Sequence, residues 1–180
     1  GQQIHEAGLS LLMGVAMARG VAQRTFDRRL EGAPHLFRLR RRSAPGREAS
    51  SAHLLSLRLG DVTVSASGEL GGPAGDEIPE GCIAAHVGQP LEILSGGELR
   101  ARRREATPAG VGAEHLLMLH PHQLIVPFER FVTDASLRAY SPPVLAGTYA
   151  IKTLVDRELA PPSALDRLGY RDDAEGGARP

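Results

Sequence analysis

The sequence predicts a single α+β domain in which a duplicated antiparallel β unit forms a pseudo-symmetric sheet, flanked by a long N-terminal helix and a C-terminal helix. Three observations support this fold class: an internal repeat, segments that alternate between apolar and polar residues, and helical spacing near both ends of the chain. The 180 residues are enough for one self-sufficient hydrophobic core. We expect the domain to span residues 1–168 and a mobile polar tail to follow at 169–180.

The internal repeat relates residues 36–66 to residues 98–128. An Arg-x-Arg-Arg-Arg block at 38–42 recurs at 100–104, and a His-Leu-Leu-x-Leu block recurs at the same distance after it. We therefore expect the two segments to superpose as the same arrangement of strands, with His53 and His115 at equivalent positions.

The N-terminal segment is apolar in its first half and keeps helical character to Leu30, before Gly32 and Pro34 stop it. We expect one helix of roughly 25 residues, too short an apolar run to span a membrane. Small residues spaced four apart would let another backbone approach one face of this helix, and a second copy of the chain is one available partner, so a homodimer is expected. These residues are Gly14, Ala18 and Ala22.

Period-two alternation and β-branched residues predict the strands of both units. The expected strands are residues 35–42, 53–59, 62–67, 82–87, 91–94 and 98–104, followed by a hairpin over 115–128. Gly60 and Asp61 are expected to turn the first hairpin, and His120-Pro121-His122 the second. Residues 68–81 are rich in glycine and predict a long loop.

The C-terminal helix is predicted to start at Ser141-Pro142-Pro143, because a hydroxyl can cap a helix and proline is well tolerated in its first turn. It is expected to run from about Val144 to Leu159 and to pack on the sheet. Residues 163–166 resemble a capping box and predict one further turn.

Arginine is the strongest functional signal, because 20 of the 21 basic residues are Arg and alternate residues of a strand share one face. The guanidinium group binds phosphate and carboxylate bidentately, which predicts a non-catalytic binding or assembly module that holds an anionic small molecule or an acidic partner. Internal acids or a GC-rich genome are alternative explanations. The expected ligand-binding residues are Arg38, Arg40, Arg42, Arg100, Arg102 and Arg104.

Nucleic acid is a less favoured partner than a compact anion. Basic and acidic residues number 21 each, Trp is absent, and aromatic residues make up 4%, so neither a strong field nor stacking platforms are expected. The single lysine, Lys152, lies outside any phosphate-loop pattern, and no motif identifies a family.

The alternative function is a small hydrolase-type enzyme. A His-x-His pair near a carboxylate or a cysteine near a histidine would supply its site. The candidates are His115, His120, His122 and Glu129, or Cys82 and His86. We expect no metal and no cofactor, and the single cysteine fits a reducing, cytoplasmic, bacterial setting.

Overall fold

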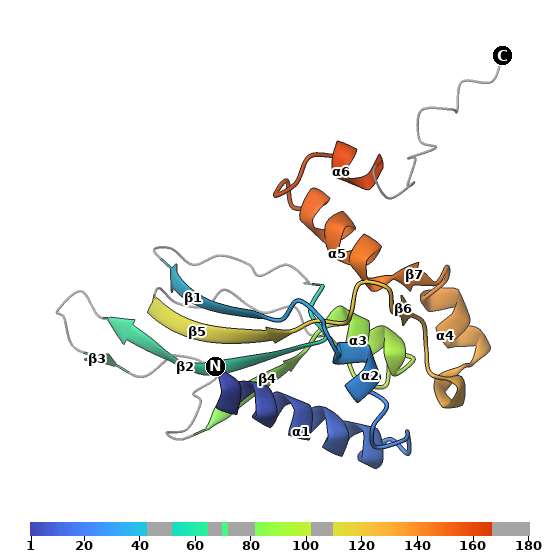
Figure 1. Cartoon of the computed structure of the whole chain (residues 1–180), viewed down its shortest axis with the longest axis horizontal. Helices are drawn as coiled ribbons and strands as arrows, with labels where there is room; N and C mark the ends of the chain where they lie inside the picture. The colour runs from blue at the N-terminus through green and yellow to red at the C-terminus, as the bar shows by residue number, and fades with distance from the viewer. Residues whose placement is uncertain (43–51, 65–69, 72–81, 102–109, 167–180) are drawn as a thin grey trace.

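The computed structural model describes residues 1–42, 52–64, 70–71, 82–101 and 110–166. The helices and strands are labelled in chain order in Figure 1. The elements are α1 (Gln2–Ala18), α2 (Asp27–Leu30), β1 (Leu36–Arg42), β2 (Leu55–Val64), β3 (Leu70–Gly71), β4 (Ile83–Val87), α3 (Gln89–Leu94), β5 (Gly110–Leu117), β6 (Leu124–Ile125), the 3-10 turn η1 (Glu129–Phe131), α4 (Asp134–Ala139), β7 (Val144–Leu145), α5 (Ala146–Val155) and α6 (Ser163–Asp166).

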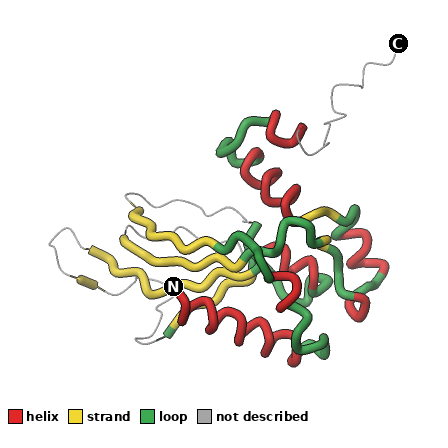
Figure 2. The backbone as a smooth tube through the Cα atoms, viewed as in Figure 1, coloured by secondary structure: helices red, strands yellow, loops and turns green. Residues whose placement is uncertain are grey.

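The described strands form an antiparallel five-stranded sheet in which β5 lies between β1 and β2. Strand β2 also pairs with β3 near its end and with β4. Figure 2 shows the strands of this sheet gathered on one side of the molecule, with most of the short helices and the β6–β7 pair on the other, while α1 runs along the sheet. The predicted mixture of helices and an antiparallel sheet is confirmed.

Helix α1 covers one face of the sheet with a stripe of residues spaced four apart. A Cβ added to Gly8 would lie 2.6 Å from Cδ1 of Leu117 and 2.7 Å from Cδ1 of Leu57, so both leucine side chains would have to shift to admit a methyl group. Nothing lies within 4 Å of the corresponding point at Gly14, and the predicted homodimer stays a prediction. The buried stripe consists of Ile4, Gly8, Leu12 and Ala16.

The N-terminal helix is shorter than the sequence predicted. It ends at Ala18, and Gly20 follows with a positive φ of 61°, a conformation that glycine adopts at little cost. The carbonyl of Gly20 accepts a hydrogen bond of 2.9 Å from Nη1 of Arg130, which fixes the turn. Of the remaining residues of the expected helix, only Asp27–Leu30 are helical, as the separate short helix α2.

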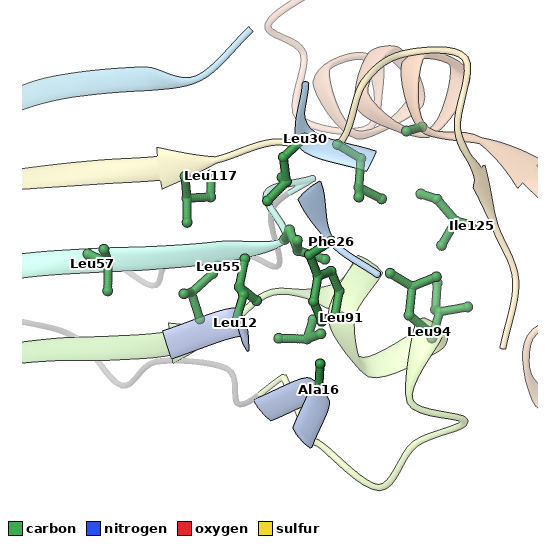
Figure 3. Packing of buried hydrophobic residues seen from close by; sticks show 14 of the residues in the cluster. Leu12, Ala16, Phe26, Leu30, Leu55, Leu57, Leu91, Leu94, Leu117 and Ile125 are labelled. Atoms are coloured by element: carbon green, nitrogen blue, oxygen red, sulfur yellow. The ribbon is translucent and has the colours of Figure 1, made fainter. Parts of the chain in front are cut away.

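Buried leucines from distant parts of the chain make the hydrophobic core, seen from close by in Figure 3. Leu91 and Leu94 reach it from α3, where the sequence predicted a strand at 91–94. A short, fully buried apolar run has no diagnostic period. Gly88 in an extended conformation, followed by Pro90 in the first turn, starts a helix instead.

The duplication is not confirmed by the structure. Residues 36–66 contain β1 and β2, whereas the described residues 98–101 form no strand and residues 102–109 lie outside the description. His53 precedes β2, but His115 lies within β5. The two His-Leu-Leu-x-Leu blocks therefore do not occupy matching positions in their strands.

Neither predicted hairpin has the expected form. Strand β2 continues through Gly60 and Asp61 with an irregularity in its pairing to β5 between Leu59 and Val62. After β5 the chain forms β6, which pairs with β7 rather than with β5. Strand β7 also takes residues expected in the C-terminal helix, so α5 begins at Ala146.

Two further predictions concern the C-terminal residues of the chain. Helix α6 confirms the short turn expected at 163–166, while the predicted tail at 169–180 lies outside the described residues. In the part of the chain that is described, no helix reaches the length and apolar character needed to cross a membrane.

Candidate functional site

The sheet face turned away from α1 carries polar and charged side chains. Residues paired directly across neighbouring strands share a face. Arg38 of β1 and Arg58 of β2 both pair with Glu114 of β5, and Ser56 of β2 pairs with His86 of β4. We call these five residues the Glu114 face.

Three members of the Glu114 face are buried, with exposed fractions of 2% for Ser56, 3% for Glu114 and 8% for Arg58. Charged groups are rarely buried unless they are paired, because removing them from water is costly. Clustered buried ionisable groups are more frequent at functional sites than elsewhere. The Glu114 face is therefore the best candidate site among the described residues.

Glu114 is held as a carboxylate by Arg38. The Nε and Nη2 atoms of Arg38 donate to Oε2 of Glu114 at 2.8 and 2.6 Å. Burial tends to raise the pKa of Glu114, but the hydrogen bonds and charge of Arg38, helped by Ser56 and His53, outweigh it and hold that pKa below its ordinary value. Glu114 is thus a fixed negative hydrogen-bond acceptor at neutral pH.

Gly88 brings His53 close to the end of β4. Its N–H donates to the carbonyl of Leu54 at 3.0 Å, and a Cβ at Gly88 would overlap the carbonyl oxygen of His53. The positive charge that His53 gains on protonation also acts on the pKa of Glu114, so His53 lies within electrostatic reach of the Glu114 face.

The six predicted binding arginines do not form two matched rows in the described residues. Arg38 is bound to Glu114, and Arg100 lies outside any strand, where its Nη1 donates to Glu92 at 3.2 Å. These two guanidinium groups are therefore neutralised by acids of the chain itself. Arg40 and Arg42 lie on β1 but their side chains are outside the description, as are Arg102 and Arg104 entirely.

The predicted enzyme residues do not converge. His115 lies on the sheet face under α1, and the rings of His120 and His122 lie 5.4 Å apart in the segment after β5. Glu129 begins the turn η1. Cys82 is exposed just before β4, whereas His86 lies within that strand.

Sequence reasoning missed Glu114, Ser56, Arg58 and His53. The alternation along β5 indicates that Glu114 and His115 point to opposite faces. No local signal could show that Arg38 would lie opposite Glu114, because the pairing joins segments that are far apart in the sequence.

The comparisons with known proteins identify a fold. No family model matches the sequence, and no curated protein matches it. Among solved structures, a 2OG-Fe(II) oxygenase family protein from Caulobacter crescentus superposes with a TM-score of 0.69 at 15% identity, over 86% of this chain and 56% of its own. The chain has the fold of the 2OG-Fe(II) oxygenases.

Two other solved structures with this fold also superpose on the chain. A full-length Neurospora crassa protein in complex with alpha-KG superposes with a TM-score of 0.68 at 13% identity, over 86% of this chain and 58% of that protein. The rice dioxygenase for auxin oxidation gives 0.63 at 20% identity, over 92% of this chain and 60% of that protein. This chain thus spans somewhat more than half the length of the oxygenase-fold proteins it matches.

This likeness overturns both functions predicted from the sequence. The oxygenase-fold proteins are neither non-catalytic anion-binding modules nor hydrolases. The arginine pattern misled because Arg-rich composition and chance spacing gave the appearance of a repeated cationic strand, whereas Arg38 and Arg100 serve internal ion pairs.

The oxygenase fold implies an iron ion, which two histidines and one carboxylate commonly hold in this class of enzyme. All seven histidines lie in the described residues. No group of three His, Cys, Asp or Glu residues among the described residues could hold a metal ion, and the one carboxylate of the Glu114 face is bound to Arg38. The described residues therefore do not fit the iron site. The histidines fall into three places: His5, His35 and His115 under α1, His53 and His86 beside β2 and β4, and His120 and His122 after β5.

Proposed function

We propose that this chain is the core of an enzyme that transforms a small organic molecule, and that the Glu114 face is its substrate site. The observation that carries the proposal is the buried, ionised Glu114 on a sheet whose fold is that of the oxygenases. The Neurospora crassa protein has been solved with thymine and with 5-formyluracil, and a rice neighbour is named for auxin oxidation. Small heterocycles and small organic acids similar to these compounds are therefore the first substrates to test.

The residues of the site have separable roles. Glu114 accepts hydrogen bonds from a polar substrate group, and Ser56 beside it supplies a hydroxyl that can donate or accept. His53 is the group suited to move a proton, because an imidazole nitrogen can accept or donate one and the carboxylate of Glu114 is within electrostatic reach. Arg38 keeps Glu114 ionised and oriented.

No step of the reaction is assigned to iron, because the described residues do not complete an iron site. An iron-dependent oxidation would need at least one ligand beyond the described residues. The role that we propose for the Glu114 face is to bind and orient the substrate.

The experiment is a binding screen of the full chain by isothermal titration calorimetry, using thymine and auxin as the first candidates. We expect the wild type to bind a candidate substrate and Glu114→Gln to bind it much more weakly. Glu98→Gln is the matched control, because Glu98 also pairs with an arginine but is exposed at 48%.

Ser56→Ala keeps the test decisive if Glu114→Gln fails to fold, because it removes one hydroxyl from the same face. Equal binding by the wild type, Ser56→Ala and Glu98→Gln would show that the Glu114 face is not the substrate site. Failure of a broad set of small molecules to bind or to be converted would overturn the enzyme function itself.

A further inference from the structure

Three histidines meet on the sheet face opposite the Glu114 face, between α1 and β5. His5 lies on α1, His35 lies just before β1 and His115 lies on β5. Their ring centroids are 4.8 Å apart for His5 and His35, 5.4 Å for His5 and His115, and 6.3 Å for His35 and His115. We call these residues the histidine cluster.

The hydrogen bonds of the histidine cluster suit neutral imidazoles. Nδ1 of His5 and Nε2 of His115 lie 3.1 Å apart, so one nitrogen carries the proton and the other accepts it. Nδ1 of His35 accepts from the N–H of Met118 at 3.2 Å. That nitrogen of His35 is therefore unprotonated.

His115 is the member least able to take up a proton. It is 6% exposed, and its Nδ1 is buried without a hydrogen-bond partner among the described residues. In the neutral ring this nitrogen can remain an unprotonated acceptor. In the charged ring it becomes a buried N–H donor with nothing to bind, which is costly.

The groups facing the histidine cluster do not compensate for a proton. Burial is the largest cause that lowers the pKa of His115. The charges of His5, His35 and the amino group of Gly1 lower it further. Burial and then His5 likewise lower the pKa of His35, although the backbone of Leu30 opposes them.

Among the described residues, the neighbouring elements add no acid that faces the rings. On α1, Glu6 is exposed and accepts from Gln2 at 2.9 Å. Phe37 of β1 and Leu57 of β2 pair directly with His115 and are apolar. Arg38 and Glu114 belong to the opposite face, where they bind one another.

We propose that the histidine cluster is a pH-sensitive contact that holds α1 on the sheet while the imidazoles are neutral and releases it when they take up protons. Free histidine takes up a proton at about pH 6.5, so the open state gains protons before the docked state as pH falls below that value. Docking of α1 is therefore at full strength above that pH and weakens below it. Gly8, one turn further along α1, packs on Leu57 and Leu117, so release of α1 exposes the apolar face of the sheet.

The test is hydrogen exchange of the full chain, read by mass spectrometry on peptides within residues 2–18 and expressed as protection factors to remove the intrinsic effect of pH. We expect protection of α1 to fall roughly tenfold between about pH 7.5 and about pH 5.5, and more than that of β2. His5→Gln should show a smaller fall, because it removes one of the mutually repelling charges. His122→Gln, altered at an exposed histidine, should respond like the wild type.

A second readout keeps the test decisive if a variant is unstable. Imidazole proton resonances of the wild type should show His115 titrating below the value of about 6.5 that is ordinary for histidine. Equal protection of α1 at the two pH values would overturn the proposal. So would a full response in His5→Gln, or a His115 that titrates at or above the ordinary histidine value of about 6.5.

Discussion

Replacing Glu114 with glutamine removes the acceptor charge of the ion pair while keeping the shape of the side chain. The side chain of Glu114 is 4% exposed and that of Arg38 is 31% exposed. Breaking a fully buried pair costs about 3–5 kcal/mol, and Arg38 regains part of its hydration because a third of it meets water. We therefore expect a loss of about 2–3 kcal/mol, which lowers the melting temperature by roughly 4–12 °C in a chain of this size.

Urea and thermal unfolding followed by circular dichroism measure this loss. Because the pKa of Glu114 is lower in the folded chain than its ordinary value of 4.5, the stabilisation is present above that pH and disappears as pH falls through the folded pKa. The difference between wild type and Glu114→Gln should thus be constant near neutral pH and shrink in acid. Combining the change with Arg38→Gln should give a coupling energy of about 1.5–3 kcal/mol.

The reasoning would be refuted by a Glu114→Gln variant within about 0.5 kcal/mol of the wild type, the range typical of surface substitutions. A loss that persists unchanged in acid would also contradict it. Either result would mean that the Arg38 contacts do not hold Glu114 in solution.

Glycine substitutions test the two close approaches in the fold. Gly8→Ala should destabilise the chain by about 1–2 kcal/mol in urea unfolding, because its methyl group would press on Leu117 and overpack the helix–sheet contact. Gly14→Ala, on the open side of the same helix, should instead stabilise by about 0.5–1 kcal/mol, and equal effects at the two positions would contradict the assigned face. Gly88→Ala should cost more than either, at roughly 3 kcal/mol, because its methyl group meets the backbone of His53, and it should shift the His53 resonances in NMR spectra. An intact His53 environment in that variant would show that the close approach is not required.

The sequence predicted elements wherever a local pattern decides the conformation. Alternation identified β1, a short apolar run identified β4, and a capping pattern identified α6. Prediction from the sequence failed where the conformation of a segment depends on residues far away in the sequence. The apolar run at 91–94 is compatible with a buried strand and with a buried helix. Only Gly88 and Pro90, at the start of the segment, indicate that it forms the helix α3.

The candidate site was less predictable than the fold. Composition drew attention to the arginines, but the function of Arg38 depends on Glu114, which reaches it only through the pairing of β1 with β5. The three rings of the histidine cluster likewise come from separate parts of the chain. Without knowledge of strand order, residues with no local periodic signal could not be grouped into a site.

The position of β5 between β1 and β2 also sets the order in which the sheet can be completed during synthesis. Strands β1 and β2 emerge from the ribosome first but do not pair with one another. Their shared neighbour follows about 70 residues after β1, which is a delay of several seconds at about 5–20 residues per second. Two strand edges remain unpaired in this interval, and pairing between distant segments is slow. Newly made chains are therefore most exposed to aggregation, and to binding by chaperones, before Gly110–Leu117 has been synthesised.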